Sequence, residues 1–287
     1  HHHGLGEQAN RAMTAQTTIA TDQATGNLFR DLWHYRYALQ NLILKDFKVR
    51  YRNMSLGIAW SVLNPLIMLG VLVVVFAYIH PNHTTKYFPI FLLLGMVSFN
   101  FFSHCISPAS GCIVENASLV KKIVFPRIIL PISVIFSQTI QLLFQILVLI
   151  FFIFIFHLEP NWHWFWAVPV FVIETIFILG MGMMIAVANV YFRDTQYLVH
   201  SILTVMFWFT PIFYNVSMVK QNMHPVIYWL YLLNPLAGCI DTLRLAIIDN
   251  RPPNPETLGV AVIISLCVFT TGVLVFSSRA REMTDKL

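Results

Sequence analysis

The stretch 42-LILKDFKVRYRNMSLGIAWSVLNPLIMLGVLVVVFAYI-79 decides the architecture of this chain. Its uncharged part, from Met54 to Ile79, is long enough to cross the ~30 Å hydrocarbon core of a bilayer as a helix. Cations ahead of a first span resist translocation and keep that end in the cytoplasm. The sequence therefore predicts an integral membrane protein oriented by this junction. Four cations precede the apolar run: Lys45, Lys48, Arg50 and Arg52.

Composition supports a membrane protein. The 287 residues are 57% hydrophobic and 11% charged, whereas soluble domains carry about 25% charged residues. The modest excess of 18 Lys and Arg over 13 Asp and Glu fits an anionic membrane face and gives no nucleic-acid-binding surface. The cysteines form no CxxC pair, so we expect small buried side chains and neither a disulfide nor a metal site. They are Cys105, Cys112, Cys239 and Cys267.

The N-terminal region divides into two segments. Residues 1–26 begin with three histidines, as an affinity-tag remnant does, and Met13 is a plausible native start. This segment has no apolar core typical of a cleaved signal peptide. Residues 27–53 follow, with leucines at three- and four-residue spacing, which predicts an amphipathic helix lying in the membrane interface. The alternative is a cytosolic helix packed on a neighbouring span.

We expect the rest of the chain, 54–287, to be an all-α transmembrane domain with six spans. A re-entrant helix pair at about 224–250, broken at Asn234-Pro235, fits better than a seventh span, which would place the basic C-terminal tail outside. With six spans, both termini and fourteen of the 18 Lys and Arg residues are cytoplasmic, and Arg244 is one of the four outside. The spans are about 56–79, 88–114, 128–157, 164–190, 198–216 and 257–276. Gly180 and Gly182 allow close helix contact in the fourth span, and Pro211 breaks the fifth near its outer end.

Polar side chains inside the predicted spans allow two interpretations. Gln138, Gln141 and Gln145 form a stripe that either lines a transport path or makes hydrogen bonds between helices. Glu174 is either functional or a neutral or hydrogen-bonded acid that faces another helix. His80 and His83 have metal-ligand spacing but no third ligand in view, so a solvated turn is the favoured interpretation.

The loop 115-ENASLVKKIVFPR-127 is basic, as cytoplasmic loops are. Asn116 and Ser118 can cap a short helix at about 116–124 before Pro126, and such a helix suits contact with a soluble partner. The chain lacks GxxxxGK[ST], HExxH and GxSxG motifs. We therefore expect no catalytic residues, cofactors or metal in this chain, and a conduit driven from elsewhere.

Several motifs carry a family resemblance. The run LKDFKVRYRNMSLGIAWSVLNPL, the loop ENASLVKKIVFPR, the sequence NVYFRD and the later NPL stretch resemble ABC type-2 permeases of polysaccharide exporters. These are the membrane subunits of O-antigen, capsule and wall teichoic acid exporters (Wzm, KpsM and TarG types). The likeness extends from about Leu28 over nearly the whole chain.

This resemblance implies a homodimer in the bacterial cytoplasmic (inner) membrane, with each copy bound to a separate ATPase subunit that holds ATP and Mg. The implied substrate is a lipid-linked polysaccharide. The first cytoplasmic loop would be the coupling helix in a cleft of the ATPase, the interfacial helix would form part of a cytoplasmic gate, and the re-entrant helices would close the outer end. The implied coupling residues are Asn116, Leu119, Lys121, Lys122 and Arg127.

Weak, numerous contacts suit a sliding glycan, and aromatic faces stack on sugar rings without fixing a register. For each aromatic candidate, ordinary packing or lipid contact is an equal alternative. Lys45, Lys48, Arg50 and Arg52 are candidates for contacting a lipid diphosphate, or else only determine topology. The pathway candidates are Trp60, Phe207, Phe209, Phe213 and Tyr214, and the outer-gate candidates are Asn234 and Pro235.

Two other functions compete with this one. An ABC exporter of drugs or small lipids would respond to small amphiphiles. A polytopic glycosyltransferase or acyltransferase would need clustered carboxylates or histidines at one membrane face, for which His224, Asp241 and Asp249 are loose candidates.

Overall fold

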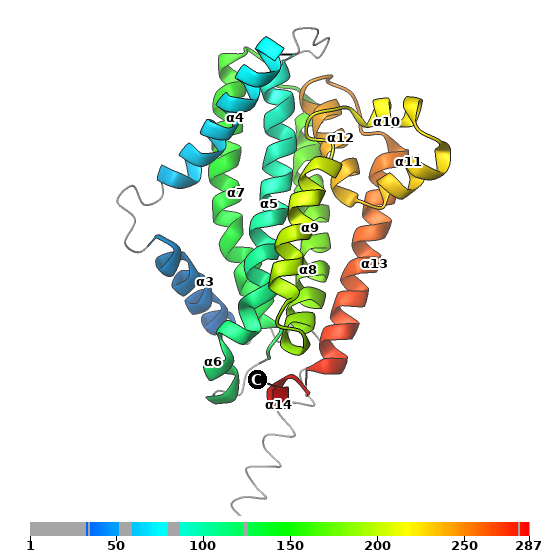
Figure 1. Ribbon diagram of the computed structural model, residues 1–287. Coiled ribbons are helices and arrows are strands. Elements are labelled where there is room, and N and C mark those ends of the chain that lie inside the picture. Colours follow the sequence, from blue (N-terminus) through cyan, green and yellow to red (C-terminus); the bar gives the residue numbers. More distant parts are fainter. Residues whose placement is uncertain are drawn as a thin grey trace, which may run out of the picture.

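The computed structural model describes residues 33, 35–51, 59–79, 87–122, 126–280 and 282–286, which form helices and connecting turns without strands (Figure 1). Long helices run side by side, with α6 and α14 at the lower end of Figure 1 and α10, α11 and α12 at the upper end. The first seven elements are α3 (Arg36–Tyr51), α4 (Ala59–Ile79), α5 (Phe88–Glu115), α6 (Ala117–Lys122), α7 (Ile129–Ile155), η2 (Trp162–Trp166) and α8 (Ala167–Tyr191). The others are α9 (Thr195–Phe209), α10 (Val216–Asn222), α11 (Pro225–Leu232), α12 (Pro235–Ile247), α13 (Pro255–Arg279) and α14 (Met283–Lys286).

Four helical stretches in the described part of the chain are long and apolar enough to cross a membrane: α5, α7, η2 with α8, and α13. They correspond to the predicted second, third, fourth and sixth spans. The chain is therefore a multi-pass membrane protein. In α4 the apolar stretch is shorter, Leu63–Val75, and α9 has 15 residues, so the prediction of six spans is not confirmed.

The predicted bounds of span five, 198–216, were wrong at both ends. Helix α9 begins at Thr195 and ends at Phe209. Proline lacks the N–H that continues a helix and disfavours helical geometry in the residue before it. Thr210, which precedes Pro211, accordingly has extended backbone angles of φ −77° and ψ 143°. The break expected at Pro211 is confirmed, and it removes the whole of 210–215 from the helix.

Helices α11 and α12 form a bent pair that meets at 89°. The break lies at Asn234-Pro235, as predicted. Asn234 caps α12 by accepting a hydrogen bond from Leu236 N at 3.2 Å, and Pro235 occupies the first turn, where no N–H is needed. The same asparagine–proline arrangement starts α13, where Asn254 accepts from Glu256 N at 3.0 Å. Local sequence therefore fixes both helix starts.

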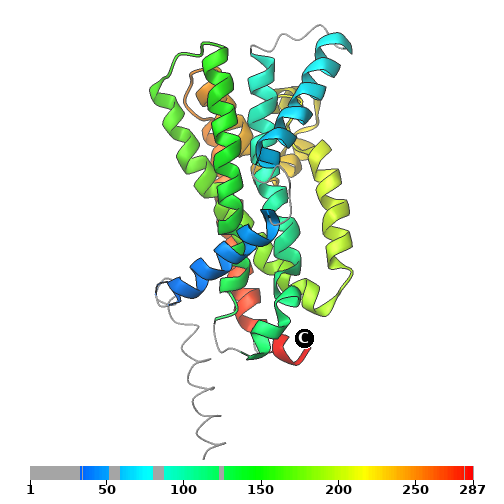
Figure 2. The same cartoon turned by 90° about the vertical axis from the view of Figure 1, so that its left-hand side faces the viewer.

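Helix α3 is the described part of the predicted segment 27–53, and it crosses the lower part of the bundle obliquely (Figure 2). It packs against α7, and Leu39 and Leu42 lie against the lower apolar core. Tyr37, Leu44 and Val49 are exposed. The helix thus packs part of its apolar surface, including the half-buried Leu39 and Leu42, on the bundle and presents further apolar side chains outward.

The core is built around α5, which packs against α7 and α8 and is buried along most of its length. Helices α8 and α13 approach each other most closely at Gly180 and Gly272. A Cβ at Gly180 would lie 2.5 Å from the Phe269 Cα, so only glycine permits this crossing. The close approach that the sequence suggested for Gly180 is confirmed.

Candidate functional site

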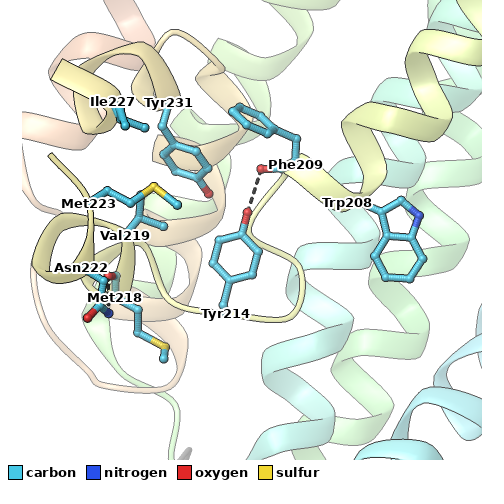
Figure 3. Close-up of a pocket in the computed structure, with 9 residues that line it drawn as sticks. All are labelled: Trp208, Phe209, Tyr214, Met218, Val219, Asn222, Met223, Ile227 and Tyr231. Carbon is cyan, nitrogen blue, oxygen red and sulfur yellow. Dashed lines mark hydrogen bonds between the residues drawn. The ribbon is translucent and has the colours of Figure 1, made fainter. Parts of the chain in front are cut away.

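A cavity of about 440 Å³ lies at the upper end, between the end of α9 and helices α10 and α11 (Figure 3). Its wall is almost wholly apolar, with aromatic rings on one side and two methionines on the other. Flat rings and flexible thioethers accept varied ligands through weak contacts. The lining residues are Trp208, Phe209, Tyr214, Met218, Val219, Asn222, Met223, Ile227 and Tyr231.

Two tyrosines supply polar atoms to this cavity. The Tyr214 hydroxyl donates to the Phe209 carbonyl oxygen at 2.8 Å. The Tyr231 side chain is 3% exposed. Figure 3 shows the hydroxyls of Tyr214 and Tyr231 pointing toward one another. The polar atoms of these two side chains therefore face each other at one side of an otherwise apolar cavity.

The five predicted pathway aromatics do not form one surface. Phe209 is half exposed and Tyr214 lines the cavity with it. Phe207 instead packs inward, its ring centroid 5.3 Å from that of Phe99 and 5.5 Å from that of Phe213. Trp60 is 44% exposed on α4, which packs against α5 and α7 and contributes nothing to the cavity. Two of the five therefore share a site.

Sequence reasoning missed Trp208, which lines the cavity and is 67% exposed. Trp208 could have been inferred from its position, because it directly precedes Phe209 in the last turn of a helix that ends before a proline. Sequence reasoning also missed Met218 and Met223, which lie on and just after α10, a helix that was not predicted. Tyr231 lies on the first half of the predicted re-entrant pair but was not named as a site residue.

The predicted outer-gate residues join the cavity wall to α12. Besides capping α12, Asn234 donates from Nδ2 to Thr210 Oγ1 at 3.1 Å, and both residues are buried. Pro235 is buried beside it. The break between α11 and α12 is therefore bonded directly to the break after α9.

The sequence placed Arg244 among the four outer cations and gave it no further role. Its side chain is 4% exposed in α12. The guanidinium donates four hydrogen bonds to backbone carbonyl oxygens of α5 and of the segment after α9. Partners that arrive from distant segments cannot be inferred from the spacing of charges along one helix.

At the lower end, α6 is the predicted coupling helix, shortened to Ala117–Lys122. Leu119 packs against the lower core and Val120 is buried, while Lys121 is exposed. Arg127 is half buried in the turn before α7. The side chain of Lys122 lies outside the described residues. Of the predicted coupling residues, Lys121 is therefore exposed at the lower end, and Leu119 holds α6 on the bundle.

Asn116, a predicted coupling residue, is hydrogen-bonded to Lys45, a predicted lipid-headgroup contact. It ends α5, donates from Nδ2 to the Cys112 carbonyl oxygen at 2.8 Å and accepts from Lys45 Nζ at 2.8 Å. Lys45 is thus bound to the junction before α6, while Lys48, one turn further along α3, is exposed. The side chain of Arg50 and all of Arg52 lie outside the described residues.

The polar residues of the predicted spans are buried in the bundle. Gln138 and Gln145 are 2% and 1% exposed on α7, and Glu174 is fully buried on α8. Both carboxylate oxygens of Glu174 lack a hydrogen-bond partner among the described residues. His80 and His83 lie outside those residues, and the described part contains no group of three side chains able to hold a metal. Cys105, Cys112 and Cys239 are buried, as expected, whereas Cys267 is exposed.

Known proteins resemble the chain over nearly its whole length. An O-antigen export system permease protein of Myxococcus xanthus is 26% identical over 91% of this chain and 99% of its own length. An O-antigen export system permease protein of Klebsiella pneumoniae is 29% identical over 81% of this chain and 88% of its own length. A polysialic acid transport protein of Escherichia coli is 24% identical over 86% of this chain and 95% of its own length.

Residues 37–248, from α3 to the end of α12, match the family described as ABC-2 type transporter. That range contains the coupling region, the bent helix pair and every residue of the cavity. The chain belongs to the ABC-2 type transporter family.

Proposed function

We propose that this chain is the permease subunit of an ABC exporter that moves a lipid-linked polysaccharide across the bacterial cytoplasmic membrane. The observation that carries the proposal is the family match over residues 37–248, together with relatives named for O-antigen export and polysialic acid transport that align along almost their full length. The chain carries no nucleotide-binding motif, so energy comes from a separate ATPase subunit, which holds ATP and Mg. Two copies of each subunit make up the exporter.

In this proposal the lower end of Figure 1 faces the cytoplasm. The exposed Lys121 on α6 meets the ATPase, and Leu119 and Val120 transmit its movement into the lower core. The Lys45–Asn116 hydrogen bond carries part of that movement to α3. The cations Lys45 and Lys48 lie on the helix that the lipid diphosphate of the substrate would pass.

The upper cavity lies on the glycan path in this proposal. Phe209, Trp208 and Tyr214 offer ring faces to sugars. A site made of aromatic ring faces with few polar groups binds a sugar ring weakly. The ring is therefore released quickly, as a chain that slides through the site requires. The bent pair α11–α12 is a re-entrant element that closes the outer end, with Asn234 and Pro235 at its break.

The proposal is tested by reconstituting the chain with its cognate ATPase in vesicles loaded with the host's lipid-linked glycan. Movement of glycan to the opposite leaflet, measured by lectin access, is expected only with ATP. Lys121→Glu is expected to uncouple ATP hydrolysis from glycan movement, because it reverses the charge that faces the ATPase. Arg251→Glu reverses the charge of an exposed arginine in the turn after α12; it is the matched control and is expected to leave coupling unchanged.

The competing functions predict other results. Stimulation of ATP hydrolysis by small amphiphiles, with no response to glycan, would identify a drug or small-lipid exporter. Transferase activity of the chain without an ATPase would identify a membrane enzyme. Its candidate residues already have structural roles: His224 Nδ1 accepts from Val226 N at 3.3 Å as the cap of α11, and Asp241 accepts from Thr257 Oγ1 at 2.9 Å.

A further inference from the structure

The segment Thr210–Tyr214 leaves backbone carbonyls without helical partners. It follows the end of α9, and it contains Pro211, so α9 cannot continue through it. Ile212 is fully buried. A buried carbonyl oxygen requires a donor from somewhere in the structure, and the segment itself has no regular ladder to provide one. The position of this cavity wall therefore depends on a donor from another element.

Arg244 is that donor. Its Nη2 donates to the Ile212 carbonyl oxygen at 2.7 Å, and its Nη1 to the Tyr214 carbonyl oxygen at 2.9 Å. The same side chain reaches α5, where Nη2 and Nε donate to the Phe91 carbonyl oxygen at 3.1 and 3.3 Å. One guanidinium on α12 thus joins α5 to the wall segment. Arginine can bridge these segments because its five N–H donors are spread over a planar guanidinium. The donors of a lysine ammonium all lie on one nitrogen and cannot reach all three carbonyl oxygens.

The packing around the guanidinium is matched to its shape. The Phe91 ring lies 3.4 Å from the guanidinium carbon. Opposite, Gly95 leaves the space: a Cβ there would lie 3.0 Å from Arg244 Nη2 and 3.0 Å from the Ile212 Cα. Glycine is therefore the residue that lets α5, Arg244 and the wall segment meet.

We propose that Arg244 is the positioning residue of the upper cavity: it locks the wall segment Thr210–Tyr214 to α5 and α12 and so sets the opening through which substrate leaves. The segment cannot move away from α5 unless the guanidinium releases one set of carbonyls. The link to substrate exit rests on the proposed function, but the positioning role does not.

The test measures access to the cavity directly. Val219 lines the cavity and is 5% exposed, so Val219→Cys in a Cys267→Ser background reports opening through its rate of reaction with a water-soluble maleimide. Arg244→Met is expected to raise that rate about tenfold or more, because local opening no longer breaks buried hydrogen bonds. Arg251→Met removes an exposed arginine from the turn after α12 and is expected to leave the rate unchanged.

Two further variants keep the proposal testable if Arg244→Met fails to fold. Arg244→Lys retains the charge but not the fork, and is expected to raise labelling nearly as much. Gly95→Ala crowds the guanidinium and is expected to give a smaller increase. Labelling at the parent rate in folded Arg244→Lys and Gly95→Ala proteins would overturn the proposal.

Glycan export by the same variants separates the two proposals. Faster labelling together with impaired export supports both. Faster labelling with unaltered export confirms the positioning role and counts against the cavity as the exit. Unaltered labelling overturns the positioning role whatever export does.

Discussion

Two asparagines stand at breaks between consecutive helices, Asn116 between α5 and α6 and Asn234 between α11 and α12. In each, the side-chain Nδ2 donates one hydrogen bond and Oδ1 accepts another. Asn234 is 8% exposed and bonds to Thr210 and to the Leu236 N–H, both in the buried upper end. Asn116 is half buried and bonds to the Cys112 carbonyl and to the solvent-exposed Lys45.

The difference lies in what surrounds the bonds. At the upper end the hydrogen bonds have no water to replace them, so breaking one leaves polar groups unsatisfied. At the lower end water substitutes for the Lys45–Asn116 bond, so this bond is weak and readily exchanged. The upper break is therefore fixed and the lower junction is adaptable. Under the function proposed above, the fixed upper break would close the outer end and the adaptable lower junction would move with the ATPase.

The largest expected effect is that of Asn234→Ala. It removes the cap of α12 and the bond to Thr210, and should lower the free energy of unfolding by about 2–3 kcal/mol. Thermal unfolding of the purified chain in detergent, followed by tryptophan fluorescence, measures it. Asn234→Asp keeps the acceptor for Leu236 N and should lose less. A parental melting temperature for the alanine variant would show that this break is not fixed as described.

Thr210→Val should cost less, about 1–2 kcal/mol, because it removes the acceptor for Asn234 Nδ2 while preserving side-chain shape and leaving the helix cap intact. The double variant with Asn234→Ala should lose less than the sum of the two single losses, since both remove the same bond. Strict additivity in unfolding experiments would mean that the Asn234–Thr210 bond contributes nothing.

Lys45→Met should change stability by at most about 1 kcal/mol, because its bond to Asn116 is exposed. Its effect is expected instead on coupling: fewer glycans moved per ATP hydrolysed by the reconstituted exporter. Lys48→Met, one turn along the same helix, is the matched control. Equal coupling in both variants would contradict a role for Lys45 in linking α3 to the α6 junction.

The smallest effect concerns the exposed end of the chain. Arg279 and Tyr191 donate to Glu282 at 2.8 and 2.9 Å and lower the pKa of its carboxyl below the usual value of 4.5. A lowered pKa stabilises the fold at pH values above the ordinary one, and that stabilisation disappears as pH falls through the lowered value. Glu282→Gln should therefore slightly flatten the acid side of a melting-temperature profile. An unaltered profile would mean that this contact is lost in solution.

The accuracy of the sequence predictions followed the range of the interactions. The bounds of α5, α7 and α13 were close, because length and hydrophobicity are local properties. The breaks at Pro211 and Asn234 were also predicted, since proline acts on its own backbone. The end of α9 was misplaced by several residues, because the apolar pattern continues to Val216 even though Pro211 stops the helix.

The candidate site was less predictable. Of the candidates named from the sequence, Phe209 and Tyr214 line the cavity and Asn234 lies at the break between α11 and α12, whereas Trp60 lies on α4 and Phe207 packs inward. Tyr231 and Arg244 were missed as site residues. Their roles depend on α10–α12 folding back on α9, and neither periodicity nor composition specifies that fold.

By itself, the sequence determined that this protein is helical and embedded in a membrane, where its helices break, and which basic segments flank its spans. These follow from apolar length and from proline and asparagine chemistry within a few residues. Only the tertiary structure decided which polar groups are buried and what satisfies them. Arg244 reaches the Phe91 carbonyl across 153 positions of sequence and Lys45 reaches Asn116 across 71. The partner of a buried donor is set by the helices packed around it, and these can come from distant parts of the sequence.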